Sequence, residues 1–209
     1  RELERESRLC ECIMGHCTYE GGYFDIKYCT VAFLESVAVN GSEPSRNAFL
    51  GSCCIYSSDP AIPLLLSKIP VFQIGLKADK MLSFYSAFNL NYGYFWGASS
   101  GNPYLRARAA TDIVLFGYRM LLQEREVLFP SQKGLLHAME ELEQKPEGIV
   151  EKGNLLLSRM DDSSKDSFVS SILEFIKYHP PADYNEVLTR YIEDNELWWY
   201  KQRPLIAEW

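Results

Sequence analysis

The feature that most constrains the fold is a change in hydrophobic pattern at Pro70. Before Pro70, short segments alternate apolar and polar residues with the period of a β-strand, whereas after it apolar residues recur at helical spacing. We therefore expect strands only before about residue 72, in an α+β chain of two domains. Residues 1–74 are predicted to form a small mixed sheet with helices, and residues 75–209 an all-helical bundle.

The second domain carries the longer helical patterns. The segment "IVLFGYRMLL" is apolar nearly all round, so its helix is expected at the centre of the bundle. The segment "GASSGNP" is the clearest loop, since its small residues, glycines and proline break the pattern. Helices are predicted over residues 75–97, 104–126, 131–143, 147–158, 164–178 and 184–200.

The first domain mixes short elements of both kinds. A strand is predicted over residues 23–30 from alternation in "YFDIKYC", and a second short strand in "CCIYSS". The opening "RELERESRLCECI" is interpreted as the end of an amphipathic helix. Three further helices are expected in "TVAFLESVAVNG", which Gly41 ends, in a segment capped by Ser42, and in "AIPLLLSKIP".

Two charged residues stand out on the strand 23–30. Asp25 and Lys27 are two residues apart, so both side chains point to one face, while Phe24 and Ile26 are expected to turn to the core. We predict that the charged face lines the cleft between the two domains. From these residues alone, two interpretations stay open, a solvated face with a weak ion pair or a metal-ligand carboxylate.

The helix 104–126 carries Arg108, Asp112 and Arg119 on or near one stripe of an otherwise apolar surface. Charges on so apolar a helix need a wet cleft or mutual pairing. A structural Arg108–Asp112 salt bridge and a cleft-lining role are both compatible with this spacing. Lys133 follows Pro130 in the first turn of a helix, where the dipole disfavours a cation, so either an anionic ligand or plain solvent exposure explains it.

The segment "YIEDNELWWYKQRPLIAEW" concentrates three of the four tryptophans among charges. For most of these residues we favour core packing of a terminal helix over stacking on a nucleobase or sugar. The P-loop, the dinucleotide-binding glycine pattern, the nucleophile elbow and the zinc-protease motif do not occur in the sequence. The three histidines fit no nucleophile–base pattern, which argues against a hydrolase triad.

Composition narrows the possible partners. A net charge of −7 argues against non-specific binding to nucleic acid, and no apolar run approaches the roughly 20 residues of a membrane span. The six cysteines include the cluster "CECIMGHC", which lacks the C-x2-C spacing of a zinc site. We interpret them as reduced cysteines of a cytoplasmic protein.

Four segments, taken in order along nearly the whole chain, resemble bacterial nucleotidyltransferases of the polymerase-β-like superfamily, closest to the aminoglycoside and lincosamide nucleotidyltransferases. The segments are "GGYFDIKY", "FLESVAVNGSEPSRNAFLGSCCIYSSDPAIPLLLSKIP", "TDIVLFGYRMLLQEREVLFPSQKGLL" and the C-terminal "YIEDNELWWYKQRPLIAEW". The resemblance implies a small sheet that bears catalytic carboxylates, followed by a helical bundle. It also implies Mg2+-dependent transfer of a nucleoside monophosphate from a nucleoside triphosphate, with ATP expected, to a hydroxyl of a small molecule or protein.

The resemblance assigns roles to particular residues. Asp25 matches the third metal-ligand carboxylate of the family. Lys133 would contact the triphosphate, and Arg108, Asp112 and Arg119 would line the cleft and help to bind the nucleotide. These roles need two further carboxylates, which the family carries as D-x-D on a strand.

The sequence departs from the family at that point, because no strand in it contains D-x-D. The family places D-x-D ahead of the strand matching 23–30, and the chain begins with Arg1. We therefore expect an incomplete or inactive form of such an enzyme. The alternative is a degenerate, non-catalytic member of the fold that binds or assembles through its aromatic helices.

Overall fold

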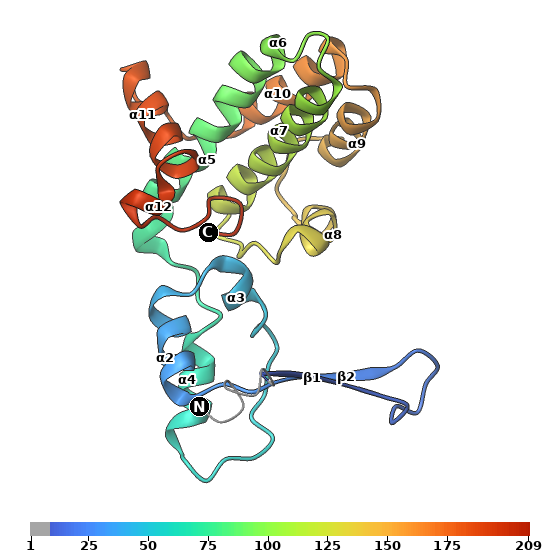
Figure 1. Ribbon diagram of the computed structural model, residues 1–209, viewed down its shortest axis with the longest axis vertical. Coiled ribbons are helices and arrows are strands. Elements are labelled where there is room, and N and C mark those ends of the chain that lie inside the picture. The colour runs from blue at the N-terminus through green and yellow to red at the C-terminus, as the bar shows by residue number, and fades with distance from the viewer. Residues whose placement is uncertain (1–8) are drawn as a thin grey trace. The chain divides into compact units, whose positions relative to one another are not determined.

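The computed structural model of the chain describes residues 9–209 and combines many helices with one small antiparallel sheet. The start of the predicted amphipathic helix in "RELERESRLCECI" lies outside the described residues. The chain forms two compact units (Figure 1). The first comprises the chain up to Gly41 together with Gly51–Ile69, and the second comprises Ser42–Leu50 and Pro70–Trp209. The segment Ser42–Leu50, predicted as part of the first domain, thus belongs to the second unit.

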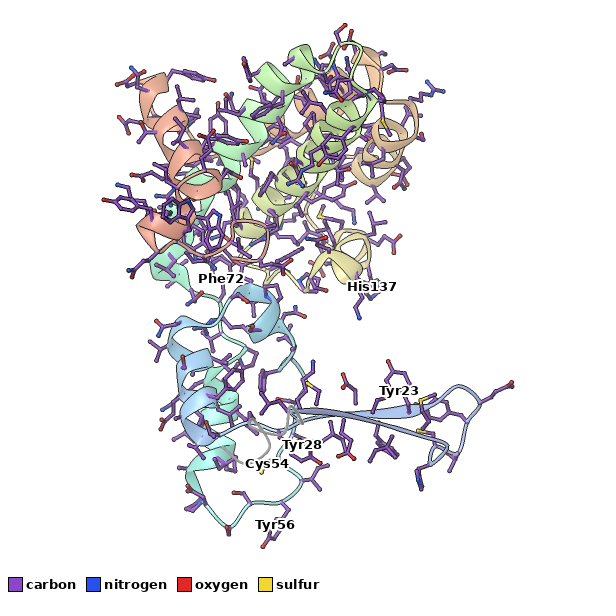
Figure 2. The ribbon with its side chains drawn as sticks, viewed as in Figure 1. Tyr23, Tyr28, Cys54, Tyr56, Phe72 and His137 are labelled. Carbon is purple, nitrogen blue, oxygen red and sulfur yellow. The ribbon has the colours of Figure 1, made fainter. Side chains whose placement is uncertain are left out.

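The first unit contains a β-hairpin of β1 (Cys10–Met14) and β2 (Tyr23–Lys27), in which Cys12 opposes Asp25. The described sheet is antiparallel, so the prediction of a mixed sheet is wrong. The prediction of a helix end at Cys10–Met14 is also wrong, because pairing with β2 makes this segment a strand. The predicted strand in "CCIYSS" is wrong as well. Residues 53–58 form an irregular loop without a ladder partner, and Figure 2 shows Tyr56 on it. Both described strands lie before residue 72, as predicted.

The described part of the first unit also contains α2 (Val31–Asn40) and α4 (Ala61–Lys68), which pack against each other. The Thr30 hydroxyl begins α2 by accepting a hydrogen bond from the Phe33 amide at 3.1 Å, and Gly41 ends it as predicted. Among the described residues, no helix covers either face of the hairpin, which extends away from α2 and α4 in Figure 1.

The second unit is built around α7 (Pro103–Glu124), which Asn102 caps and Pro103 opens. As predicted, this helix is central, and its residues Ile113–Gln123 are all buried. It packs against α5, α9 and α10. The remaining helices are α3 (Glu43–Asn47), α5 (Lys77–Leu90), α6 (Trp96–Ala98), α8 (Leu135–Glu141), α9 (Ile149–Arg159), α10 (Asp162–Phe175), α11 (Tyr184–Asn195) and α12 (Trp198–Lys201).

The predicted helix 75–97 is less regular than expected. A short 3-10 turn, Ile74–Leu76, precedes α5, and Asn91–Phe95 forms a π-helical turn between α5 and α6. A π-turn inserts an extra residue into the helical repeat, which rotates the face that follows it. As a result Trp96 is buried, and its indole donates a hydrogen bond of 2.6 Å to Asp162.

The tryptophans of the C-terminal segment divide between core and surface. Trp209 is buried, as the favoured packing interpretation predicted. Trp198 is partly exposed and Trp199 is 66% exposed, so that interpretation is wrong for these two residues. The helix α12 has only four residues, too short to present one buried face through both rings.

Candidate functional site

Asp25 and Lys27 lie on the same face of β2, and their side chains are 54% and 73% exposed. The Asp25 carboxylate is 3.9 Å from the Lys27 ammonium, a distance at which an exposed ion pair contributes little. Ile26 on the opposite face is partly covered, but Phe24 is 52% exposed, so the predicted turn of Phe24 to the core is wrong. Phe24 stays exposed because no described helix packs on the hairpin. That Asp25 faces a cleft stays a prediction.

Arg108 and Asp112 form the salt bridge that their spacing allows, with Arg108 Nε donating to Asp112 at 2.7 Å. Burial raises the pKa of Asp112, and the hydrogen bond from Arg108 offsets part of that effect. The same bond raises the pKa of Arg108. The two side chains therefore satisfy each other on the surface of α7.

Arg119, on the same helix, is fully buried. Its guanidinium carbon lies 4.3 Å from the ring centre of Phe84 and 4.0 Å from that of Phe129. It donates to the Glu43 carboxylate at 3.4 Å, to the Ala207 carbonyl at 3.1 Å and, at closer range, to the Trp209 carbonyl. Burial lowers the pKa of Arg119 to about 10, although Glu43 favours the charged form.

Glu43 is the centre of this buried cluster, and sequence reasoning missed it. One oxygen of its buried carboxylate accepts from Lys80 at 2.9 Å, and the other accepts from Arg119 and from the Phe129 amide at 3.1 Å. Burial lowers the pKa of Lys80, although Glu43 raises it. Two buried cations thus share one carboxylate. Lys80 carried a usable signal, since it lies in the apolar helix α5 as Arg119 does in α7.

A second ion network lies on α5 and α11. Arg190 donates to Ser83 at 2.7 Å, to Asp194 at 3.0 Å and to the Asp79 carbonyl at 2.9 Å, and pairs closely with the Asp79 carboxylate. Arg203, beyond α12, also pairs closely with Asp194 and lies 3.6 Å from Asp79. Local spacing could indicate the Arg190–Asp194 pair, whose members are one helical turn apart. It could not indicate Arg190–Asp79 or Arg190–Ser83, whose members are more than 100 positions apart.

Lys133 is exposed on the 3-10 turn Gln132–Gly134, which leads into the seven-residue helix α8. Solvent exposure is the simpler of the two explanations that its position allowed. Of the five residues singled out from the sequence, the fold brings together Arg108 and Asp112. Arg119 lies in the buried cluster, and its described partners are none of the other four.

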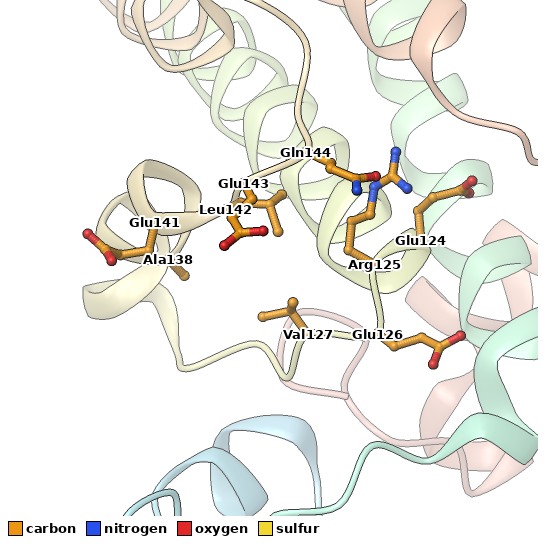
Figure 3. Close-up of a pocket in the computed structure, with 9 residues that line it drawn as sticks. All are labelled: Glu124, Arg125, Glu126, Val127, Ala138, Glu141, Leu142, Glu143 and Gln144. Carbon is orange, nitrogen blue, oxygen red and sulfur yellow. The ribbon is translucent and has the colours of Figure 1, made fainter.

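A pocket of about 550 Å3 opens between the end of α7 and α8 (Figure 3). Four glutamates line it, Glu124, Glu126, Glu141 and Glu143, against a single cation, Arg125. Such a lining repels a triphosphate. None of the residues predicted from the sequence lines this pocket.

The described residues were also tested as a metal site. Within residues 9–209, no group of three or more histidine, cysteine, aspartate or glutamate side chains is placed to hold a metal ion. Mg2+ demands near-octahedral oxygen ligation, and two such ions need several carboxylates. Asp25 and its described neighbours therefore do not by themselves form the site that the resemblance implies.

Comparison with known proteins adds no relative, since no family model, curated protein or solved structure matches the chain. The helices of the described residues include none that combines the length and the apolar character needed to cross a bilayer. All six cysteines are free. A cytoplasmic location stays a prediction.

Proposed function

We propose that the chain is a polymerase-β-like nucleotidyltransferase, or part of one, acting in Mg2+-dependent transfer of a nucleoside monophosphate to a hydroxyl. The donor would be a nucleoside triphosphate, with ATP expected, and the acceptor a small molecule or protein. Support comes from the ordered resemblance along nearly the whole sequence. The observation that carries the proposal is Asp25, a strand carboxylate that is half exposed and whose one ion pair among the described residues is a long one with Lys27.

In this proposal Asp25 supplies one metal ligand, and the other carboxylates come from outside the described residues. Lys133, being exposed, is available to a triphosphate. Arg108 and Asp112 stabilise each other and are not assigned a catalytic role. Arg119 is buried, and it is available to phosphate only if the C-terminal segment with Ala207 and Trp209 moves away from it.

The test is a pyrophosphate-release assay with labelled ATP and Mg2+ against a panel of hydroxyl acceptors. For the 209-residue chain we expect no detectable transfer, because one carboxylate cannot hold two Mg2+ ions in the required geometry. A longer product of the same gene that carries D-x-D ahead of the chain should be active, and should lose activity on Asp25→Asn. The exposed Asp166 provides a matched control, since Asp166→Asn should leave activity unchanged.

A longer product that carries D-x-D and still transfers no nucleotide would contradict the proposed activity. Robust turnover by the 209-residue chain would support the activity but show that the account of the missing ligands is wrong. Full activity of the Asp25→Asn variant in the longer product would remove Asp25 from the reaction.

The alternative is a non-catalytic assembly module. One observation favours it, namely that Trp199 and Tyr200 on α12 are both largely exposed, with their rings in edge contact at 5.9 Å. Exposed aromatic residues of this kind are enriched at protein interfaces. If this alternative holds, the chain should self-associate in sedimentation equilibrium, and Trp199→Ala should make it monomeric. A parent chain that is already monomeric would exclude self-assembly.

A further inference from the structure

Residues Arg203–Trp209, here called the strap, follow α12 and lie against the buried cations of the second unit. Arg203 pairs with Asp194, the carbonyls of Ala207 and Trp209 accept from Arg119, and the Glu208 carboxylate accepts from Gln132 at 3.2 Å. Ile206 and Trp209 are buried. The strap is therefore held by several contacts, and it covers charged side chains, which are unusual in a protein core.

The strap covers a pair of buried cations. Arg119 and Lys80 are both buried and share the single carboxylate of Glu43. The other acceptors of Arg119 are backbone oxygens of Ala207 and Trp209, and its buried Nε has no hydrogen-bond partner among the described residues. A buried cation without full compensation is costly, since desolvation outweighs partial pairing.

The Trp209 ring lies among three cations. Its centre is 5.7 Å from the Lys80 ammonium, 5.8 Å from the Arg190 guanidinium and 5.3 Å from that of Arg203. A ring face and two carbonyls are the ligands that the strap offers to this group. Phosphate oxygens carry full negative charge and would therefore attract these cations more strongly than the ring face and the Ala207 carbonyl do.

We propose that the strap is an internal occupant of a polyphosphate-binding site, in which Arg119 and Lys80 are the binding cations and the incoming anion displaces Trp209. The choice of polyphosphate rests on the proposed function, but binding here needs neither a metal ion nor transfer. Because the strap is tethered to the site, it competes at high local concentration and lowers the apparent affinity for the anion. Weakening the strap should therefore tighten binding.

The experiment is calorimetric titration of inorganic tripolyphosphate, in metal-free buffer, into the parent chain and two variants. Trp209→Ala removes the ring from the cations and should tighten binding about tenfold, the effect of losing cation–π contacts worth about 1–2 kcal/mol. Trp199→Ala, at the exposed tryptophan of α12, should leave affinity at the parental value. ATP is titrated in parallel, and tighter binding of ATP than of tripolyphosphate assigns the site to a nucleotide.

Hydrogen exchange of the parent chain gives a second readout that needs no variant. Saturating tripolyphosphate should deprotect the strap amides, including the Glu208 amide that now bonds the Leu205 carbonyl at 2.9 Å. Unchanged exchange in the strap overturns the inference, as does equal affinity of the parent and Trp209→Ala. These measurements involve no transfer, so their failure leaves the pyrophosphate assay as the separate test of the proposed function.

Discussion

The two compact units hold the same chemical pair, a carboxylate and an ammonium, in opposite surroundings. Asp25 and Lys27 of the first unit are exposed and 3.9 Å apart, whereas Glu43 and Lys80 of the second are buried at 2.9 Å. Water screens the first pair, so it contributes little to stability and stays open to a ligand. The second pair has lost its water, so breaking it leaves an uncompensated charge.

The units differ in the same way in their cores. The contiguous apolar core lies entirely in the second unit, around α5, α7 and α10. Among the described residues of the first unit, only Val37 and Ile69 are buried apolar side chains. An isolated hairpin is marginally stable in water. The second unit therefore holds the packed core, while the described part of the first keeps its polar groups accessible.

The largest expected effect comes from Glu43→Gln. This change leaves the buried cations Lys80 and Arg119 without a carboxylate, which should cost about 3–5 kcal/mol in the free energy of unfolding. Asp25→Asn makes the same chemical change on the exposed pair and should cost less than about 0.5 kcal/mol. Urea denaturation of both variants measures the difference. Equal losses of stability in the two variants would show that burial does not set the Glu43–Lys80 pair apart from the Asp25–Lys27 pair.

A smaller loss is expected from Gly153→Ala on α9. A Cβ at this position would collide with the Tyr118 hydroxyl, which donates to the Ile149 carbonyl at 3.2 Å. Overpacking of a dense core costs about 1–3 kcal/mol. Adding Tyr118→Phe removes the colliding oxygen and should recover part of the loss in the same denaturation assay. Additive losses in the double variant would contradict this account.

The next effect depends on pH. Burial raises the pKa of Tyr191 to about 12 and also raises those of Tyr85, Tyr92, Tyr118 and Tyr178, all in the second unit. A folded-state pKa above the unfolded value of about 10 stabilises the fold fully below pH 10, and this stability is lost as pH rises through 12.

The urea midpoint should therefore fall between pH 10 and 12, together with a late rise in tyrosinate absorbance. A constant midpoint across that range would show that these hydroxyls ionise without disturbing the core.

The smallest effect is expected for Arg108→Gln. The Arg108–Asp112 pair joins positions one turn apart on α7 and its arginine side chain is 63% exposed, so its loss should cost at most about 0.5 kcal/mol. Thermal unfolding of the variant and the parent chain checks this value. A loss as large as that of Glu43→Gln would mean that this pair is also part of the core.

Much of the secondary structure could be predicted from local signals. The cap at Ser42 and the stop at Gly41 stand where the sequence predicts them, because a cap is a contact within one turn. The errors fall on strands. Residues 10–14 were interpreted as helix and residues 53–58 as strand, since a strand depends on a partner that local sequence does not specify.

The candidate site shows the same division. From the sequence alone, Asp25 and Lys27 could be placed on one strand face, and Arg108 and Asp112 within reach of each other, because both pairs follow from backbone periodicity. The buried cluster could not be derived in this way. Glu43, Lys80, Arg119 and Trp209 come from four distant segments, and a glutamate in the first turn of a helix carries the same local signal whether water or two cations surround it. Only the packing of α3, α5, α7 and the strap removed that water, and with it decided which charges hold the fold together.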